Sequence, residues 1–135
     1  MKYLTKFIFI FLGLSLALLM QTHEMNPARL SLEEGGDGSY SGLWMFPTNA
    51  VGLPAEVSFT DCEEKQRNLP EIQGKYLVSN IKINCEESLK GKEIAFKGLT
   101  RLTDALVSVK FSDQTTFEGL ATINTSKFDI PQEVS

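Results

Sequence analysis

The sequence contains few of the residues from which catalytic and metal sites are usually built. Its 135 residues include one histidine, His23, and two cysteines, Cys62 and Cys85. Any Ser/His/Asp or Cys/His arrangement would therefore have to use His23. The chain also has no Gly-rich phosphate loop, no HExxH motif and no CxxC motif. Because no residue pattern indicates a reaction, we expect a protein that is not an enzyme.

Positive charge is also scarce. The chain has 13 Lys and Arg residues against 17 Asp and Glu residues, a formal net charge of -4 at pH 7. An acidic protein repels the phosphate backbone, so we expect no nucleic-acid partner. The acidic pairs Glu33-Glu34, Glu63-Glu64 and Glu86-Glu87 are adjacent in sequence. Neighbours in a strand point to opposite faces, so these pairs do not predict an acid/base dyad.

The sequence has only one long hydrophobic stretch, which runs from Phe7 to Met20 and follows Lys2 and Lys6. As a helix it would be shorter than the bilayer core of about 30 Å. This pattern is typical of a secretory signal, here residues 1–22. No Ala-x-Ala pattern follows the apolar run. Two alternatives stay open: a signal peptide cleaved after Thr22, or an uncleaved signal anchor that contacts the membrane through residues 7–20.

The two cysteines indicate a structural disulfide. In an exported domain, a cysteine pair most often forms a bridge. A bridge between Cys62 and Cys85 would stabilise the fold by roughly 3 kcal/mol in the chain-entropy model. A redox or metal pair would need closer spacing and more ligands.

What remains is a series of short segments with alternating polarity. They predict strands near residues 28–34, 39–46, 55–60, 75–85, 93–96, 105–111, 115–123 and 128–130. We interpret residues 61–70 as a polar loop. Seven to eight short strands with regular turns predict an all-β domain, an antiparallel, immunoglobulin-like β-sandwich over residues 23–131. Residues 132–135 form a loose C-terminal tail in this interpretation.

The alternation also predicts the core. Trp44, the only tryptophan, is assigned to core packing, and Ile123 is expected to point inward with Phe117, Gly119 and Ala121. Asp104 is interpreted as a turn or cap carboxylate before the strand that begins at residue 105. The predicted core residues are Leu30, Leu32, Trp44, Val57, Phe59, Ile81, Ile83, Ile94, Phe96, Val107, Val109 and Phe117.

His23 is the one candidate metal ligand. If the signal is cleaved after Thr22, His23 becomes the first residue, and its free amine and imidazole provide two nitrogen ligands. Cu(II) and Ni(II) favour such ligands. The alternative is an exposed terminal histidine without a role.

Several short motifs occur in a fixed order along the exported part. They are His23-x3-Pro27-Ala28-x-Leu30-x-Leu32-x-Glu34, Gly38-x-Tyr40-x3-Trp44-x2-Pro47, the spaced Cys62 and Cys85, Leu89-x-Gly91-x2-Ile94-x3-Gly98-Leu99, Thr103-Asp104-Ala105-Leu106-Val107 and Phe128-x-Ile130-Pro131. In order and spacing, this region resembles the N-terminal extracytoplasmic domain of long members of the HupE/UreJ family of bacterial membrane proteins.

The resemblance implies a location and a partner. In that family the domain precedes a bundle of membrane helices that resembles nickel and cobalt permeases. It implies a β-sandwich in the periplasm or on the outer face of the inner membrane, beside a multi-helix membrane protein. The family tends to have a histidine where His23 stands, and Pro27, Trp44, Gly91, Gly98 and Asp104 match its pattern. We therefore expect an exported accessory domain, with nickel, copper or cobalt as related metals. The alternative is a membrane-anchored protein-interaction module without a metal role.

Overall fold

The computed structural model describes residues 26–36 and 38–134. The predicted leader, residues 1–22, and His23 lie outside these residues. Within them the chain forms strands and turns and has no helix, so no helix there is long and apolar enough to span a membrane. The strands are β1 (Ala28–Gly36), β2 (Ser39–Pro47), β3 (Glu56–Phe59), β4 (Cys62–Arg67), β5 (Glu71–Gln73), β6 (Tyr76–Cys85), β7 (Glu93–Lys97), β8 (Ala105–Lys110), β9 (Thr116–Ala121) and β10 (Lys127–Asp129).

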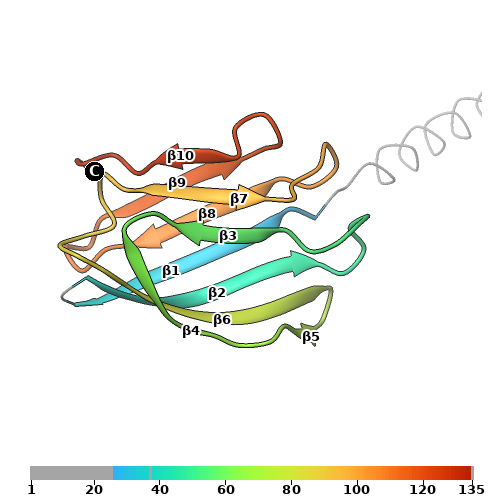
Figure 1. Cartoon of the computed structure of the whole chain (residues 1–135), viewed down its shortest axis with the longest axis horizontal. Coiled ribbons are helices and arrows are strands. Elements are labelled where there is room, and N and C mark those ends of the chain that lie inside the picture. The colour runs from blue at the N-terminus through green and yellow to red at the C-terminus, as the bar shows by residue number, and fades with distance from the viewer. Residues whose placement is uncertain (1–25, 37, 135) are drawn as a thin grey trace, which may run out of the picture.

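The strands form two sheets that pack face to face (Figure 1). The larger sheet has seven strands in the order β4-β6-β2-β1-β8-β9, with β5 also paired to β6. The smaller sheet has three strands in the order β10-β7-β3. This arrangement confirms the predicted all-β sandwich. The sheets differ in size, unlike the two similar sheets of an immunoglobulin domain.

The core lies between the sheets because strands such as β1, β6 and β8 alternate buried apolar residues with more exposed ones. In β1, for example, Ala28, Leu30 and Leu32 are buried, whereas Arg29 and Ser31 are exposed. Ten of the twelve predicted core residues are buried, and Phe59 and Phe117 are half-buried against them. The core also contains Tyr40, Phe46, Leu89, Leu99, Phe111 and Ile130.

One pair of strands is parallel, which the prediction of an antiparallel sandwich did not include. The first strand, β1, runs antiparallel to β2 but parallel to β8, with Ala28 opposite Ala105. The amide of Ala28 donates a 2.8 Å hydrogen bond to the carbonyl of Asp104. The N-terminal strand therefore lies inside the large sheet, where neighbours on both sides satisfy its backbone groups.

The interpretation of residues 61–70 as a loop is wrong, because they include β4. All residues of β4 after Cys62 are exposed, so the strand has no apolar alternation. It forms because it pairs with β6 at the edge of the sheet, with Cys62 opposite Cys85. The short β5, also exposed throughout, was missed for the same reason.

The prediction that Ile123 points inward is also wrong. Strand β9 ends at Ala121, and Ile123 follows it with 46% of its surface exposed. The alternation therefore stops two residues earlier than the sequence suggested.

Candidate functional site

The predicted metal ligand, His23, lies outside the described residues. Residues 26–36 and 38–134 contain no group of three or more His, Cys, Asp or Glu residues that could hold a metal ion.

The predicted disulfide is confirmed. Cys62 and Cys85 are bonded, and their Cα atoms are 4.2 Å apart. Cys85 is buried in the core at the end of β6, and Cys62 is the first residue of the edge strand β4. The bridge fastens an exposed edge strand to the core.

The residues that match the family pattern lie in separate structural positions. The carbonyl of Pro27 accepts a 3.4 Å hydrogen bond from the Tyr76 hydroxyl. Gly98 has a positive φ of 98°, and a Cβ there would lie 3.4 Å from the Cα atom of Ala55. The positions of these residues indicate that they shape the fold, and they do not converge on one site.

The other three residues of the family pattern, Gly91, Trp44 and Asp104, also lie at positions that shape the fold. Gly91 has a φ of 78°, and a Cβ there would lie 2.0 Å from the Gln132 side chain. Trp44 is buried, as predicted, and Asp104 directly precedes β8. Through its backbone carbonyl, Asp104 joins the starts of β1 and β8.

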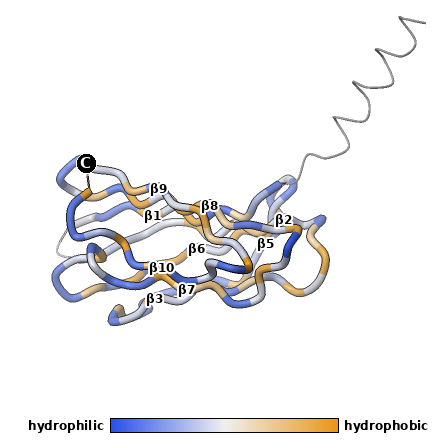
Figure 2. The backbone as a smooth tube through the Cα atoms, turned by 90° about the horizontal axis from the view of Figure 1, so that it is seen from above, coloured by the Kyte–Doolittle hydropathy of each residue, from blue (hydrophilic) through white to orange (hydrophobic). Residues whose placement is uncertain are grey.

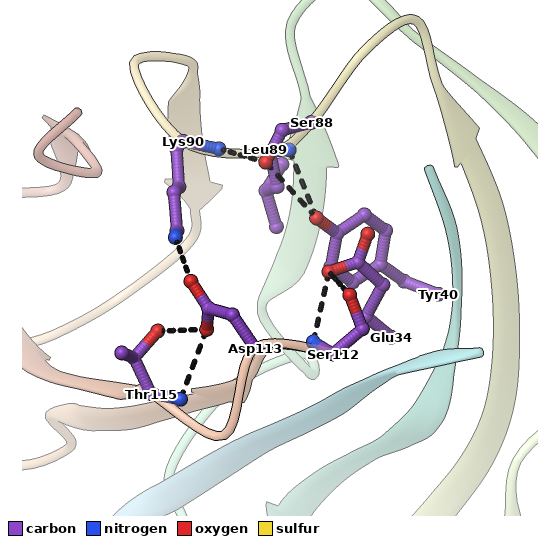
Figure 3. Close-up of polar contacts among 8 residues, drawn as sticks. All are labelled: Glu34, Tyr40, Ser88, Leu89, Lys90, Ser112, Asp113 and Thr115. Carbon is purple, nitrogen blue, oxygen red and sulfur yellow. Dashed lines mark hydrogen bonds and ion pairs between the residues drawn. The ribbon is translucent and has the colours of Figure 1, made fainter. Parts of the chain in front are cut away.

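A polar cluster joins three loops at the end of the sandwich where β1 ends (Figure 3). Lys90, between β6 and β7, donates a 2.7 Å hydrogen bond to Asp113 in the β8–β9 turn. The other Asp113 oxygen accepts hydrogen bonds from the amide and hydroxyl of Thr115. Lys90 also lies over the Phe111 ring, 4.8 Å from its centroid. The ammonium group is thus held between a carboxylate and an aromatic face.

The same end contains two further polar links. The Tyr40 hydroxyl accepts a 3.0 Å hydrogen bond from the amide of Leu89 and lies 3.4 Å from the Ser88 hydroxyl. Glu34 accepts hydrogen bonds from the amide and hydroxyl of Ser112 at 3.0 and 3.1 Å. These contacts tie the β1–β2 hairpin to the loops before β7 and before β9 (Figure 3).

The electrostatics of this cluster fit a structural role. The hydrogen bond from Lys90, together with those from Thr115, holds the pKa of Asp113 well below its usual range. Asp113 is therefore an anion at neutral pH, and both of its carboxylate oxygens accept hydrogen bonds. It is suited to holding loops together, and a proton-transfer role would need a pKa closer to neutrality.

A cleft with a volume of about 470 Å³ opens between the exposed edges of β3 and β4. Arg67 spans it, because its guanidinium group donates to the carbonyl of Val57 at 2.8 Å and pairs with Glu64. Glu56 and Lys97 also line the cleft, so both signs of charge are present. The mixed charge favours a bridge between the sheet edges over a site for one charged ligand.

The opposite end of the molecule differs strongly from the polar one. We call it the apolar end: the starts of β1, β3, β6, β8 and β10, the ends of β2, β7 and β9, β5, and the adjoining loops (Figure 1). The large apolar residues that are exposed in the described part of the chain all lie at this end. They are Val51, Leu53, Leu69, Ile72, Leu102, Leu106, Leu120 and Ile123. Figure 2 shows apolar stretches in the loops next to β2 and β5.

Part of the apolar end is a row across the outer face of the large sheet. Strand pairing aligns Met45 with Arg29, Arg29 with Leu106, and Leu106 with Leu120. Leu106 and Leu120 are 37% and 50% exposed. We call Met45, Arg29, Leu106 and Leu120 the outer row. It consists of three apolar side chains, of which Met45 is half-buried, and one cation, Arg29.

The outer row could not be predicted from the sequence, because it depends on the order of the strands in the sheet. The residues of the outer row lie far apart in the sequence, and β1 brings Met45 and Leu106 together through its two neighbours. The available signal was the apolar side chain on the outward face at residues 43, 45, 106 and 120, where a polar residue is expected.

Comparison with protein-family models, with curated proteins and with solved structures finds no match for this chain. The relationship to the HupE/UreJ family therefore stays a prediction that rests on the motifs named above.

Proposed function

We propose that this chain is an exported, non-enzymatic binding domain that acts as an accessory to a multi-helix membrane protein. The observation that carries the proposal is the outer row. On an outward sheet face, where polar residues are expected, it places the exposed Leu106 and Leu120 and the half-buried Met45 around Arg29. Adjacent apolar side chains at outward positions are typical of an interaction surface. The disulfide-bonded, all-β domain is compatible with an exported protein.

The outer row also suggests how the partner binds. Leu106 and Leu120 lie side by side on β8 and β9, and Met45 lies on the other side of Arg29. Arg29 can extend its charged group toward water or toward a carboxylate while its alkyl part covers apolar surface. The outer row suits the side of an apolar helix that carries an acidic residue.

The metal association and the periplasmic location belong to the same proposal. Both come from the resemblance and from the leader, with His23 as the suggested ligand for nickel or copper. The alternative is an interaction module held at the membrane by residues 7–20 without a metal. Both alternatives use the outer row.

Site-directed photo-crosslinking tests the proposal. A photoreactive residue placed at Leu106 in the full chain, in intact cells, should crosslink to an integral membrane protein identified by mass spectrometry. Lys110 is the matched control, because it lies on the same strand and face but at the polar end. If Leu106 gives no crosslink, or the same crosslinks as Lys110, the proposed partner surface is wrong.

A further inference from the structure

We infer that the loops of the apolar end insert into the interfacial region of a lipid bilayer. The inference concerns the β2–β3 loop, residues 48–55, and the β7–β8 loop, residues 98–104. It rests on the proposed function in that both place this end at a membrane. It adds a lipid contact that is separate from the outer row.

The exposed apolar residues Val51, Leu53 and Leu102 lie in these two loops and not in a strand. Leu53 is 87% exposed, Val51 is 72% exposed and Leu102 is 56% exposed. The transfer of leucine and valine side chains from water to the acyl-chain boundary is favourable. Side chains that project from loops can enter this boundary without moving the two sheets.

The chain enters the sandwich at the same end. Strand β1 begins at Ala28, beside the start of β8 and close to the β7–β8 loop. Where the leader is retained, residues 21–27 connect the apolar run to β1. Seven residues reach at most roughly 25 Å even when fully extended. This connection favours an orientation in which the apolar end faces the bilayer.

The distribution of charge also favours an orientation in which the apolar end faces the bilayer. The basic residues of the apolar end are Arg29, Lys75, Lys97, Arg101 and Lys127, and its acidic residues are Glu56, Glu71 and Asp104. Most of the described acidic residues therefore lie elsewhere, although the chain as a whole is acidic. Apolar side chains flanked by Lys and Arg are typical of surfaces that bind anionic lipids. An anionic bilayer would attract this end and repel the other.

Tryptophan substitutions in the full chain test this inference. Leu53→Trp and Leu102→Trp proteins are reconstituted with phosphatidylglycerol/phosphatidylcholine vesicles that contain brominated acyl chains, and fluorescence quenching is measured. Trp44 is 5% exposed, so it gives a constant background in every variant. We expect both variants to be quenched at least twofold more than the wild-type chain. Replacing the anionic lipid should reduce the quenching of any form that lacks the leader.

Lys110→Trp is the control, since Lys110 is exposed on the outer face at the polar end. It should be quenched no more than the wild type. Equal quenching of Leu53→Trp and Lys110→Trp, or none of either, would overturn the inference. If quenching is absent but Leu106 still crosslinks to a membrane protein, the lipid contact alone is wrong. If quenching occurs without that crosslink, the partner surface is wrong instead.

Discussion

The indole Nε1 of Trp44 donates a 2.9 Å hydrogen bond to the backbone carbonyl of Ala55. Trp44 lies on β2 in the large sheet, and Ala55 directly precedes β3 in the small sheet. Both residues are buried. The bond therefore connects the two layers and fixes the end of the 48–55 loop, which carries part of the apolar end.

Trp44→Phe should lower the free energy of unfolding by about 1–3 kcal/mol. Phenylalanine preserves most of the aromatic packing but leaves the buried carbonyl of Ala55 without its donor. Urea denaturation followed by far-UV circular dichroism measures the change. Tyr76→Phe is a suitable control, because it removes a 3.4 Å bond to Pro27 that is only partly buried. A loss for Trp44→Phe no larger than for this control would contradict the proposed role.

Gly42→Ala should destabilise the large sheet by about 1–3 kcal/mol or more. Gly42 lies on β2 opposite Leu32, and a Cβ there would be 1.8 Å from the carbonyl oxygen of Ser31. The clash is with backbone, so β1 and β2 would have to separate. Gly35→Ala is the matched control, since its nearest neighbouring atom would be 3.9 Å from the Cβ. Thermal unfolding midpoints that fall equally in both variants would refute this explanation.

The alternating pattern of the sequence was sufficient to predict strands whose one face is buried. Ile81 and Ile83 on β6 alternate with polar neighbours, and Val107 and Val109 on β8 lie on either side of Ser108. All four were placed in the core correctly. Strand β4 could not be found in this way, because its pairing with β6 and the bond from Cys62 to Cys85 stabilise it while its side chains face water.

The candidate surfaces were less predictable than the core. The alternation of apolar and polar residues predicts strands but not their order in a sheet. The parallel pairing of β1 with β8, which aligns Arg29 with Leu106, is therefore known only from the folded structure. The same holds for Lys90 and Asp113. Lys90 lies in the loop that crosses from β6 in the large sheet to β7 in the small sheet, whereas Asp113 lies in the turn between β8 and β9.

Reduction of the Cys62–Cys85 disulfide should lower the free energy of unfolding by about 3 kcal/mol, because the unfolded chain regains the entropy of the open loop. Urea denaturation with and without reductant measures the effect. A Cys62→Ala/Cys85→Ala double variant should lose a similar amount and should not respond to reductant. An unchanged midpoint for the reduced wild-type chain would show that β4 does not depend on the bridge.

Asp113→Asn should reduce stability at neutral pH but have less effect in acid. In the folded chain, the pKa of Asp113 is lowered, first by Lys90 and then by Thr115. A group with a lowered folded-state pKa stabilises the fold above the usual carboxyl range. That contribution disappears as the pH falls below this range toward the folded-state pKa. The difference in unfolding midpoint between wild type and variant should therefore shrink with decreasing pH.

The control for this prediction is Glu118→Gln. Glu118 is exposed on β9, and the described residues provide it with no ion pair. Its substitution should change the midpoint little. If the Asp113→Asn difference stays constant between neutral and acidic pH, the ion pair with Lys90 does not contribute to the fold.

The prediction for His23 is tested by the intact mass of the exported protein with and without Ni(II) or Cu(II). Cleavage after Thr22 would give a chain that begins at His23, whose amine and imidazole nitrogens suit both metals. Native mass spectrometry should then show one bound metal per chain, and His23→Ala should lose it. A mass that retains Met1, or a mature chain that takes up no metal, would contradict the metal role. The outer row and the apolar end would then support the metal-free interaction module.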